Sequence, residues 1–130
     1  MQVAEWLARR PEVARVLHPA LPEDPGHAIW KRDFLGASSL FGVLLRTASE
    51  KAVAAMVDEL RLFKIGASFG GFESLIVPVR PERTARPWRE PGFLLRLHVG
   101  LEAVEDLIAD LEAGFARLGA ALRDEGEIVR

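Results

Sequence analysis

The sequence predicts an α+β domain in which helices pack on one face of a small, mostly antiparallel sheet. Two patterns predict this class. Residues 93–99 alternate in character with the period of a strand, and residues 104–122 carry apolar side chains at helical spacing over several turns. Together with the shorter elements before them, they give the expected order β, β, α, β, β, α behind an initial helix.

The N-terminal part of the chain predicts four short elements separated by turn residues. The initial helix is indicated by the i, i+3, i+4 spacing of Val3, Trp6 and Leu7, and Pro11 ends it. Gly42 weakens the second strand but lies in an otherwise apolar run. The four expected elements are a helix at 2–10, a strand at 13–17, a helical turn at 28–34 and a strand at 40–46.

The C-terminal part predicts two helices and two strands. Thr47 is expected to cap the first of these helices, because Glu50 follows it at the spacing of a capping box. A loop rich in proline and arginine, residues 80–92, separates the two strands, and its alternating charges indicate a solvated segment. The four expected elements are a helix at 49–62, a strand at 74–79, a strand at 93–99 and a helix at 104–122.

Length and composition limit the classes of function. At 130 residues, the chain is long enough for one domain with its own core, spanning residues 1–130. A net charge of −2 argues against nucleic acid as a partner, and the longest uncharged run, residues 34–45, is too short to span a membrane. The absence of cysteine and of a secretory signal leads us to expect a cytoplasmic protein without disulfides.

A glycine-rich stretch, residues 66–71, is expected to form a loop at a ligand site. Its glycines can adopt positive φ and let the backbone approach a ligand, and Ser68 offers a hydroxyl among them. The stretch lacks the lysine and the following helix of a phosphate-binding loop. A bulge or tight turn without a ligand is the alternative interpretation.

Arg96 is the other candidate for binding. An arginine inside an apolar strand calls for an anionic partner, and the guanidinium group binds a carboxylate through two parallel hydrogen bonds. Arg96 and Ser68 together can therefore hold a carboxylate. The alternative for Arg96 is an ion pair with an acid on the last helix, and His98 is expected to make a structural hydrogen bond.

Neither a catalytic triad nor a metal site is visible in the sequence. The three histidines (His18, His27, His98) have no metal-ligand partner at helical or turn spacing, so no metal is expected. The three lysines (Lys31, Lys51, Lys64) show no pattern typical of a Schiff-base lysine. We therefore expect no catalytic residue in this chain.

Four stretches, in order, resemble the C-terminal domain of the cystathionine β-lyase family. This family belongs to the Cys/Met-metabolism branch of the pyridoxal-phosphate (PLP) enzymes, which have the aspartate-aminotransferase fold. The resemblance covers nearly all of this chain but only the smaller part of the family's enzyme. The stretches are GHAIWKRDF (26–34), FLGASSLFGVLL (34–45), SFGGFESL (68–75) and LLRLHVGLE (94–102).

The resemblance implies roles for three residues in binding the substrate's α-carboxylate. In the family, the arginine that matches Arg96 binds this group, and the residues that match Ser68 and Phe69 line the same pocket. The β-lyases have tryptophan at the Phe69 position, so an indole N–H donor is missing here. The γ-acting relatives usually have glutamate where this chain has Ala67 and serine where it has His98, which favours the β-lyase branch and leaves the substrate open.

The resemblance also implies what the chain lacks. The family's large domain carries the Schiff-base lysine and the PLP site, and nothing in these 130 residues matches them. The whole enzyme is a homotetrameric carbon–sulfur lyase of transsulfuration and methionine biosynthesis, which cleaves cystathionine to homocysteine, pyruvate and ammonia. This chain is expected to be inactive alone, to bind no PLP, and to need the large domain. The alternatives are a truncated domain that associates with itself or a partner, and a stand-alone module that binds an amino acid.

Overall fold

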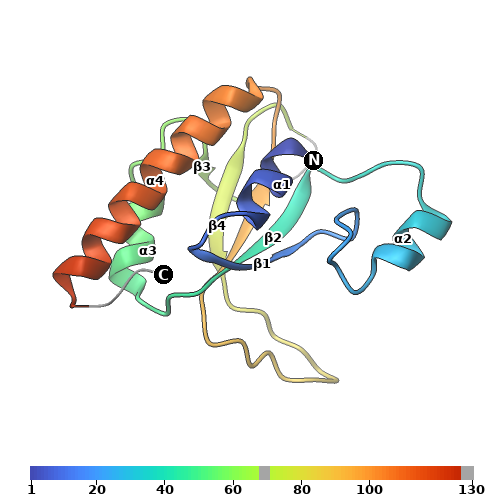
Figure 1. Ribbon diagram of the computed structural model, residues 1–130, viewed down its shortest axis with the longest axis horizontal. Helices are drawn as coiled ribbons and strands as arrows, with labels where there is room; N and C mark the ends of the chain where they lie inside the picture. The colour runs from blue at the N-terminus through green and yellow to red at the C-terminus, as the bar shows by residue number, and fades with distance from the viewer. Residues whose placement is uncertain (68–70, 127–130) are drawn as a thin grey trace.

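The chain folds around a five-stranded sheet with strand order β1-β2-β5-β4-β3, shown in the computed structural model of Figure 1. The structure describes residues 1–67 and 71–126. The α+β class is confirmed, and the expected elements occur in the expected order. The elements are α1 (Gln2–Ala8), β1 (Val13–Leu17), α2 (His27–Asp33), β2 (Leu40–Leu45), α3 (Glu50–Val57), β3 (Lys64–Ile65), β4 (Leu75–Val79), β5 (Leu94–His98) and α4 (Val104–Asp124).

One edge of the sheet differs from the prediction. β1, β2, β5 and β4 pair antiparallel in that order, whereas β3 runs parallel to β4, with Lys64 opposite Leu75 and Ile65 opposite Ile76. The sheet is therefore mixed, and not of the mostly antiparallel kind that we expected. The reason is that β3 has only two residues, both exposed, which is too short for any hydrophobic period to reveal.

Three helices cover one face of the sheet (Figure 1), as predicted. The alternation of β5 is confirmed, because Leu95 and Leu97 belong to the core whereas Arg96 lies on the other face. α3 and α4 pack on one another, and α1 contacts both β1 and α4. The largest fully buried side chains are Phe63, Phe115, Leu7, Leu45, Met56, Ile76, Leu95, Leu97, Leu107, Leu111, Leu118 and Val43.

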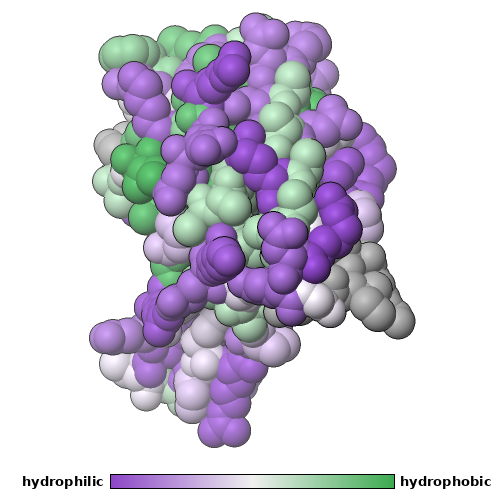
Figure 2. Space-filling model, turned by 90° about the vertical axis from the view of Figure 1, so that its left-hand side faces the viewer, coloured by the Kyte–Doolittle hydropathy of each residue, from purple (hydrophilic) through white to green (hydrophobic). Residues whose placement is uncertain are grey.

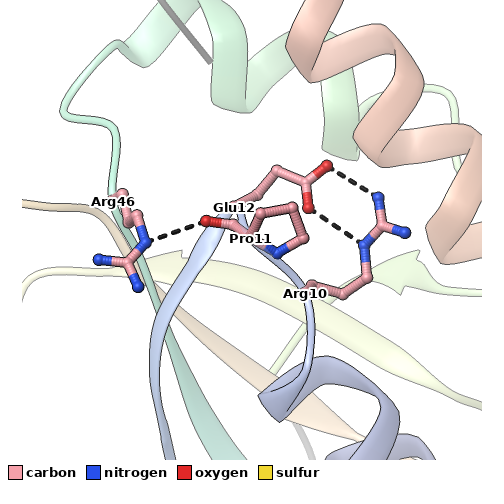
Figure 3. Close-up of polar contacts among 4 residues, drawn as sticks. All are labelled: Arg10, Pro11, Glu12 and Arg46. Carbon is pink, nitrogen blue, oxygen red and sulfur yellow. Dashed lines mark hydrogen bonds and ion pairs between the residues drawn. The ribbon is translucent and has the colours of Figure 1, made fainter. Parts of the chain in front are cut away.

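Polar contacts fix the turn from α1 into β1 (Figure 3). Arg10 forms two parallel hydrogen bonds with the Glu12 carboxylate, from Nε to Oε1 at 3.1 Å and from Nη2 to Oε2 at 2.8 Å. Arg46, which follows β2, donates from Nε to the Pro11 carbonyl at 2.9 Å. The turn is thereby held against the end of the neighbouring strand, and α1 is held over the core.

α3 is shorter than the predicted 49–62 helix, and its cap differs. The helix begins after Ser49, whose hydroxyl accepts from the Ala52 amide at 3.1 Å, so Ser49 is the N-cap in place of Thr47. Beyond the helix end, the buried carboxylate of Asp110 on α4 accepts hydrogen bonds from three successive amides, those of residues 61–63, at 2.8 to 3.1 Å. Those amides are therefore not available to continue α3.

α2 lies away from the sheet on an extended arm and has no buried residue (Figure 1). Ile29 of α2 is exposed, and so are Phe34 and Leu35, which follow the helix; the relative exposure of Leu35 is 109%. By contrast, the side of the molecule formed by α3 and α4 is mostly hydrophilic (Figure 2), as expected for the outer face of amphipathic helices. None of the described helices combines the length and apolar character needed to cross a lipid bilayer.

Candidate functional site

Arg96 occupies the middle of β5, on the face of the sheet that the three packed helices leave uncovered. In the register of the sheet, Gly42 of β2 lies opposite it on one side and Val77 of β4 on the other. Arg96 is half-buried. A strand in the centre of a sheet is a rigid support, so the guanidinium group projects from a fixed base.

The residues around Arg96 on this face are mainly apolar. Leu94, two residues before Arg96 on the same face of β5, lies opposite Leu44 of β2 and Val79 of β4. Leu44 is buried although it lies on the face away from the helices. An apolar surrounding lowers the local dielectric constant, which strengthens the attraction between a guanidinium group and an anion.

The alternative of an ion pair between Arg96 and the last helix does not hold. α4 packs on the opposite face of the sheet, and within residues 1–67 and 71–126 no hydrogen bond or salt bridge joins Arg96 to a carboxylate. Arg96 is thus a half-buried cation without a carboxylate partner in this part of the chain. Its guanidinium group can still form charge-assisted hydrogen bonds with an anionic ligand.

Gly42 is a feature of this site that we did not identify from the sequence. A Cβ atom at this position would lie 3.2 Å from Leu17 Cδ1 and 3.3 Å from Leu94 Cδ1. The glycine therefore lets these two leucines approach each other next to Arg96. The available signal was a glycine inside an apolar strand, which often marks close approach of other groups.

His98 is buried, with a relative exposure of 2%, on the same strand face as Arg96. Its Nδ1 lies 3.1 Å from the Glu73 carbonyl oxygen. This is the structural hydrogen bond that we expected. It ties the end of β5 to the residues that lead into β4.

Glu102 and Ser74 form a second polar contact at this end of the sheet, which we also did not identify from the sequence. The Ser74 amide donates to Glu102 Oε2 at 3.2 Å, and the Ser74 hydroxyl donates to Oε1 at 3.0 Å. Burial alone would raise the pKa of Glu102. Hydrogen bonds from its own amide and from Ser74, together with the charge of His98, outweigh burial and lower that pKa. Glu102 is therefore held as a carboxylate.

Ser68 and Phe69, the other two predicted site residues, lie outside the described residues. The chain on either side of them is fixed on the sheet. The Gly66 amide donates to the Ile76 carbonyl at 3.2 Å, and the Leu101 amide donates to the Phe72 carbonyl at 3.0 Å. Gly66 and Gly71 do not use the positive φ that glycine permits; among the described residues only Gly126 has one.

The lysines of this chain do not fit a Schiff-base role at the Arg96 site. Lys31 lies on α2 and Lys51 on α3, both exposed, and Lys64 on β3 forms an ion pair with Glu73 at 3.0 Å. None of them lies on β2, β5 or β4 around Arg96. The described residues also contain no cluster of three or more histidine, aspartate or glutamate side chains that could hold a metal ion.

Comparison with known proteins decides the family. A model of the Cys/Met metabolism PLP-dependent enzymes matches residues 1–116. The chain belongs to this family. The family depends on PLP, and the resemblance to cystathionine β-lyase that the four sequence stretches indicated is confirmed.

Related proteins are considerably longer than this chain. The cystathionine beta-lyase MetC of Escherichia coli (strain K12) is 53% identical over 124 residues, which cover 91% of this chain and 31% of the relative. The cystathionine beta-lyase of Salmonella typhimurium (strain LT2) is 52% identical over the same shares of the two chains. The chain thus spans about a third of the length of the curated relatives that it matches.

A solved structure with the same fold belongs to another member of the family. The cystathionine gamma synthase of Xanthomonas oryzae pv. oryzae, in complex with aminoacrylate and cysteine, superposes with a TM-score of 0.80. It is 37% identical, and the match covers 92% of this chain and 33% of that structure. The fold of the segment is therefore shared by members with different reactions.

Proposed function

We propose that this chain is the substrate-binding C-terminal domain of a PLP-dependent carbon–sulfur lyase of the cystathionine β-lyase type. The observation that carries the proposal is Arg96, a half-buried guanidinium group in the middle of an apolar sheet face, without a carboxylate partner in the described structure. Arg96 binds the α-carboxylate of a cystathionine-like amino acid through two parallel hydrogen bonds.

Ser68 and Phe69 complete the carboxylate pocket in this proposal. Ser68 offers a hydroxyl donor to the same carboxylate, and Phe69 provides an apolar wall. Both follow Gly66, whose amide is fixed on β4, and precede the anchored Phe72. Gly66 and Phe72, which lie on either side of them in the sequence, are thus both hydrogen-bonded to the sheet or to the residue pair that follows β5.

The chemistry at the substrate comes from the part of the family's enzyme that this chain does not match. PLP acts as the electron sink when it is bound there, while this chain orients the substrate. The chain by itself is inactive and works with the large domain in the cytoplasm. The two cystathionine beta-lyases described above are about three times as long as this chain. This supports the proposal that the rest of such an enzyme supplies the PLP site.

The test is a chimera in which this chain replaces the matching third of the E. coli cystathionine beta-lyase, with which it is 53% identical. Pyruvate release from cystathionine is measured at several substrate concentrations. We expect the chimera to turn over cystathionine, and the isolated 130-residue chain with added PLP to release no pyruvate. A folded chimera without activity, or an isolated chain with activity, would contradict the proposal.

Self-association is the second candidate function, because of the exposed apolar side chains near α2. Ile29, Phe34 and Leu35 are all exposed, and exposed apolar patches drive association. Sedimentation velocity of the isolated chain tests it against the triple variant Ile29→Ser, Phe34→Ser, Leu35→Ser. Oligomers that the triple variant abolishes would support this candidate, whereas a monomer at every concentration would remove it.

A further inference from the structure

Residues 22–39, which carry α2, form an arm in which no residue is buried. Three of the seven large apolar side chains that are exposed in the described structure lie close together on this arm. They are Ile29 at 58%, Phe34 at 62% and Leu35 at 109% relative exposure. The arm points away from the sheet (Figure 1). Exposed apolar side chains that are gathered in this way mark a surface that another structure covers.

α2 is too short to be stable on the strength of its own sequence. It has seven residues, and its N-cap residue, Gly26, has no side chain with which to cap it. Isolated helices of this length are marginal in water, and helices in proteins owe most of their stability to the packing of an apolar face. Ile29 on the helix, with Phe34 and Leu35 directly after it, supplies the apolar side chains for such packing. The surface on which they pack is not among the described residues.

Hydrogen bonds to the backbone hold the arm in one shape although it has no core. At its base, the buried His18 has Nε2 3.0 Å from the Ser38 carbonyl oxygen, and its Nδ1 accepts from the Ala20 amide at 3.3 Å. Within the arm, Trp30 Nε1 donates to the Gly36 carbonyl at 3.0 Å. A segment that is already held in shape loses little conformational entropy on docking, which favours binding.

The family comparisons indicate the partner. The family model matches residues 1–116, which include the arm, so the arm belongs to the family's fold and is not an addition of this chain. The two cystathionine beta-lyases are about three times as long as this chain, so about two thirds of such an enzyme lie outside the domain. A second copy of the chain is a less suitable partner, because its α3 and α4 side is mostly hydrophilic (Figure 2).

We propose that the arm is a docking element for the large PLP-carrying domain of the family's enzyme, and that an apolar surface of that domain covers Ile29, Phe34 and Leu35. This inference rests on the proposed function, which gives the chain a partner of this kind. It adds which surface of the chain the partner covers, and it does not involve the Arg96 site.

The first test compares thermal unfolding of the isolated chain and of the chimera with the E. coli relative, each with and without the triple substitution Ile29→Ser, Phe34→Ser, Leu35→Ser. These side chains are exposed in the isolated chain, so we expect its Tm to change by less than about 1 °C. In the chimera, burial of the same side chains is lost, so we expect Tm to fall by about 5 °C or more.

Ile65→Ser is the matched control for the single substitution Ile29→Ser. Both isoleucines are 58% exposed, but Ile65 lies on β3, at the edge of the sheet opposite to β1. We expect Ile29→Ser to lower the Tm of the chimera more than Ile65→Ser does, because only Ile29 lies on the arm.

The second test needs no substitution. The Trp30 amide donates to the Gly26 carbonyl at 3.0 Å, and the Phe34 amide donates to the Trp30 carbonyl at 2.8 Å. Hydrogen exchange at these two amides is measured in the isolated chain and in the chimera. We expect exchange about tenfold slower or more in the chimera, because docking suppresses local opening of α2. Equal exchange rates in the two proteins would overturn the proposal.

The outcomes separate this inference from the proposed function. A chimera that releases pyruvate and keeps its Tm in the triple variant, or loses as much Tm in Ile65→Ser as in Ile29→Ser, would overturn the inference alone. Oligomers of the isolated chain that the triple variant abolishes would assign the arm to a second copy and overturn it as well. A folded chimera that releases no pyruvate would contradict the proposed function, while its Tm shifts and exchange rates would still decide the role of the arm.

Discussion

Gly42 of β2 lies directly opposite Arg96 of β5 in the antiparallel register of the sheet. Position 42, opposite Arg96, thus has no side chain, and the side chains of Leu17 and Leu94 pack against the glycine. The glycine therefore leaves room for these two leucines to pack beside Arg96, and they add to the apolar surroundings of this arginine.

A larger side chain at position 42 tests this relationship. Gly42→Val is expected to lower kcat/KM of the chimera about tenfold or more and to destabilise the domain by about 1–3 kcal/mol, because branched methyl groups overpack against Leu17 and Leu94. Gly36→Val is the control, since a Cβ there meets nothing within 4 Å. Steady-state kinetics and urea unfolding check the two effects, and a Gly42→Val variant with unchanged kinetics would show that the Arg96 site does not depend on the packing of these two leucines.

Asp110 is expected to be the polar residue whose loss costs most stability. Asp110→Ala would leave the amides of residues 61–63 without their acceptor, which should lower the free energy of unfolding by about 2–4 kcal/mol. Glu112→Ala, an exposed acid on the same helix, should change it by less than about 0.5 kcal/mol. Urea unfolding followed by circular dichroism measures both, and equal midpoints would refute the role of Asp110.

Gly100 is expected to tolerate no side chain. A Cβ atom there would lie 2.2 Å from the Phe72 carbonyl oxygen and 2.7 Å from the Glu73 carbonyl carbon, so the backbone of these two residues would have to move. We expect Gly100→Ala to lower the free energy of unfolding by about 2 kcal/mol or more. Gly71→Ala is the control, because nothing lies within 4 Å of its Cβ position. Thermal unfolding at the same temperature in both variants would contradict the close approach.

The stability of the domain should depend on the protonation of Glu102. Its pKa is lower in the folded chain than in the unfolded chain, so its stabilising effect is complete above the ordinary carboxyl pKa. The effect is lost as the pH falls through the lowered pKa of the folded state. His98 and the Glu73–Lys64 ion pair lie nearby, so the comparison is made with Glu102→Gln, which removes the Glu102 carboxylate alone.

The measurement is urea unfolding of both proteins as a function of pH. We expect the wild-type chain to be more stable than Glu102→Gln at neutral pH, and the difference to shrink toward zero in acid. A difference that stays constant down to acidic pH would show that the carboxylate charge is not responsible.

Elements in which the hydrophobic pattern repeats several times could be predicted from the sequence. α4 and the alternation of β5 were placed correctly, because each repeats its pattern often enough to be distinguished from chance. The position of Arg96 on the uncovered face follows from that alternation alone. The family could also be identified, because its motifs follow one another along most of the chain.

Features set by contacts between distant residues could not be predicted. β3 exists because two residues pair with β4, and α3 ends early because Asp110, about fifty residues further on, binds the following amides. The proximity of Gly42 to Arg96 follows from the strand order, which no local pattern reveals. The contact between Ser74 and Glu102 likewise joins residues 28 positions apart.

The most direct test of the central claim is kcat/KM for cystathionine of the chimera with Arg96→Lys, compared with Arg86→Lys in the exposed 80–92 loop. Lysine keeps the charge but cannot form two parallel hydrogen bonds to a carboxylate. We predict that Arg96→Lys lowers kcat/KM about 10- to 100-fold while Arg86→Lys leaves it unchanged, as expected for the loss of about 1.4–2.8 kcal/mol of binding. An Arg96→Lys chimera with the kcat/KM of the parent would contradict the assignment of Arg96 as the carboxylate-binding residue.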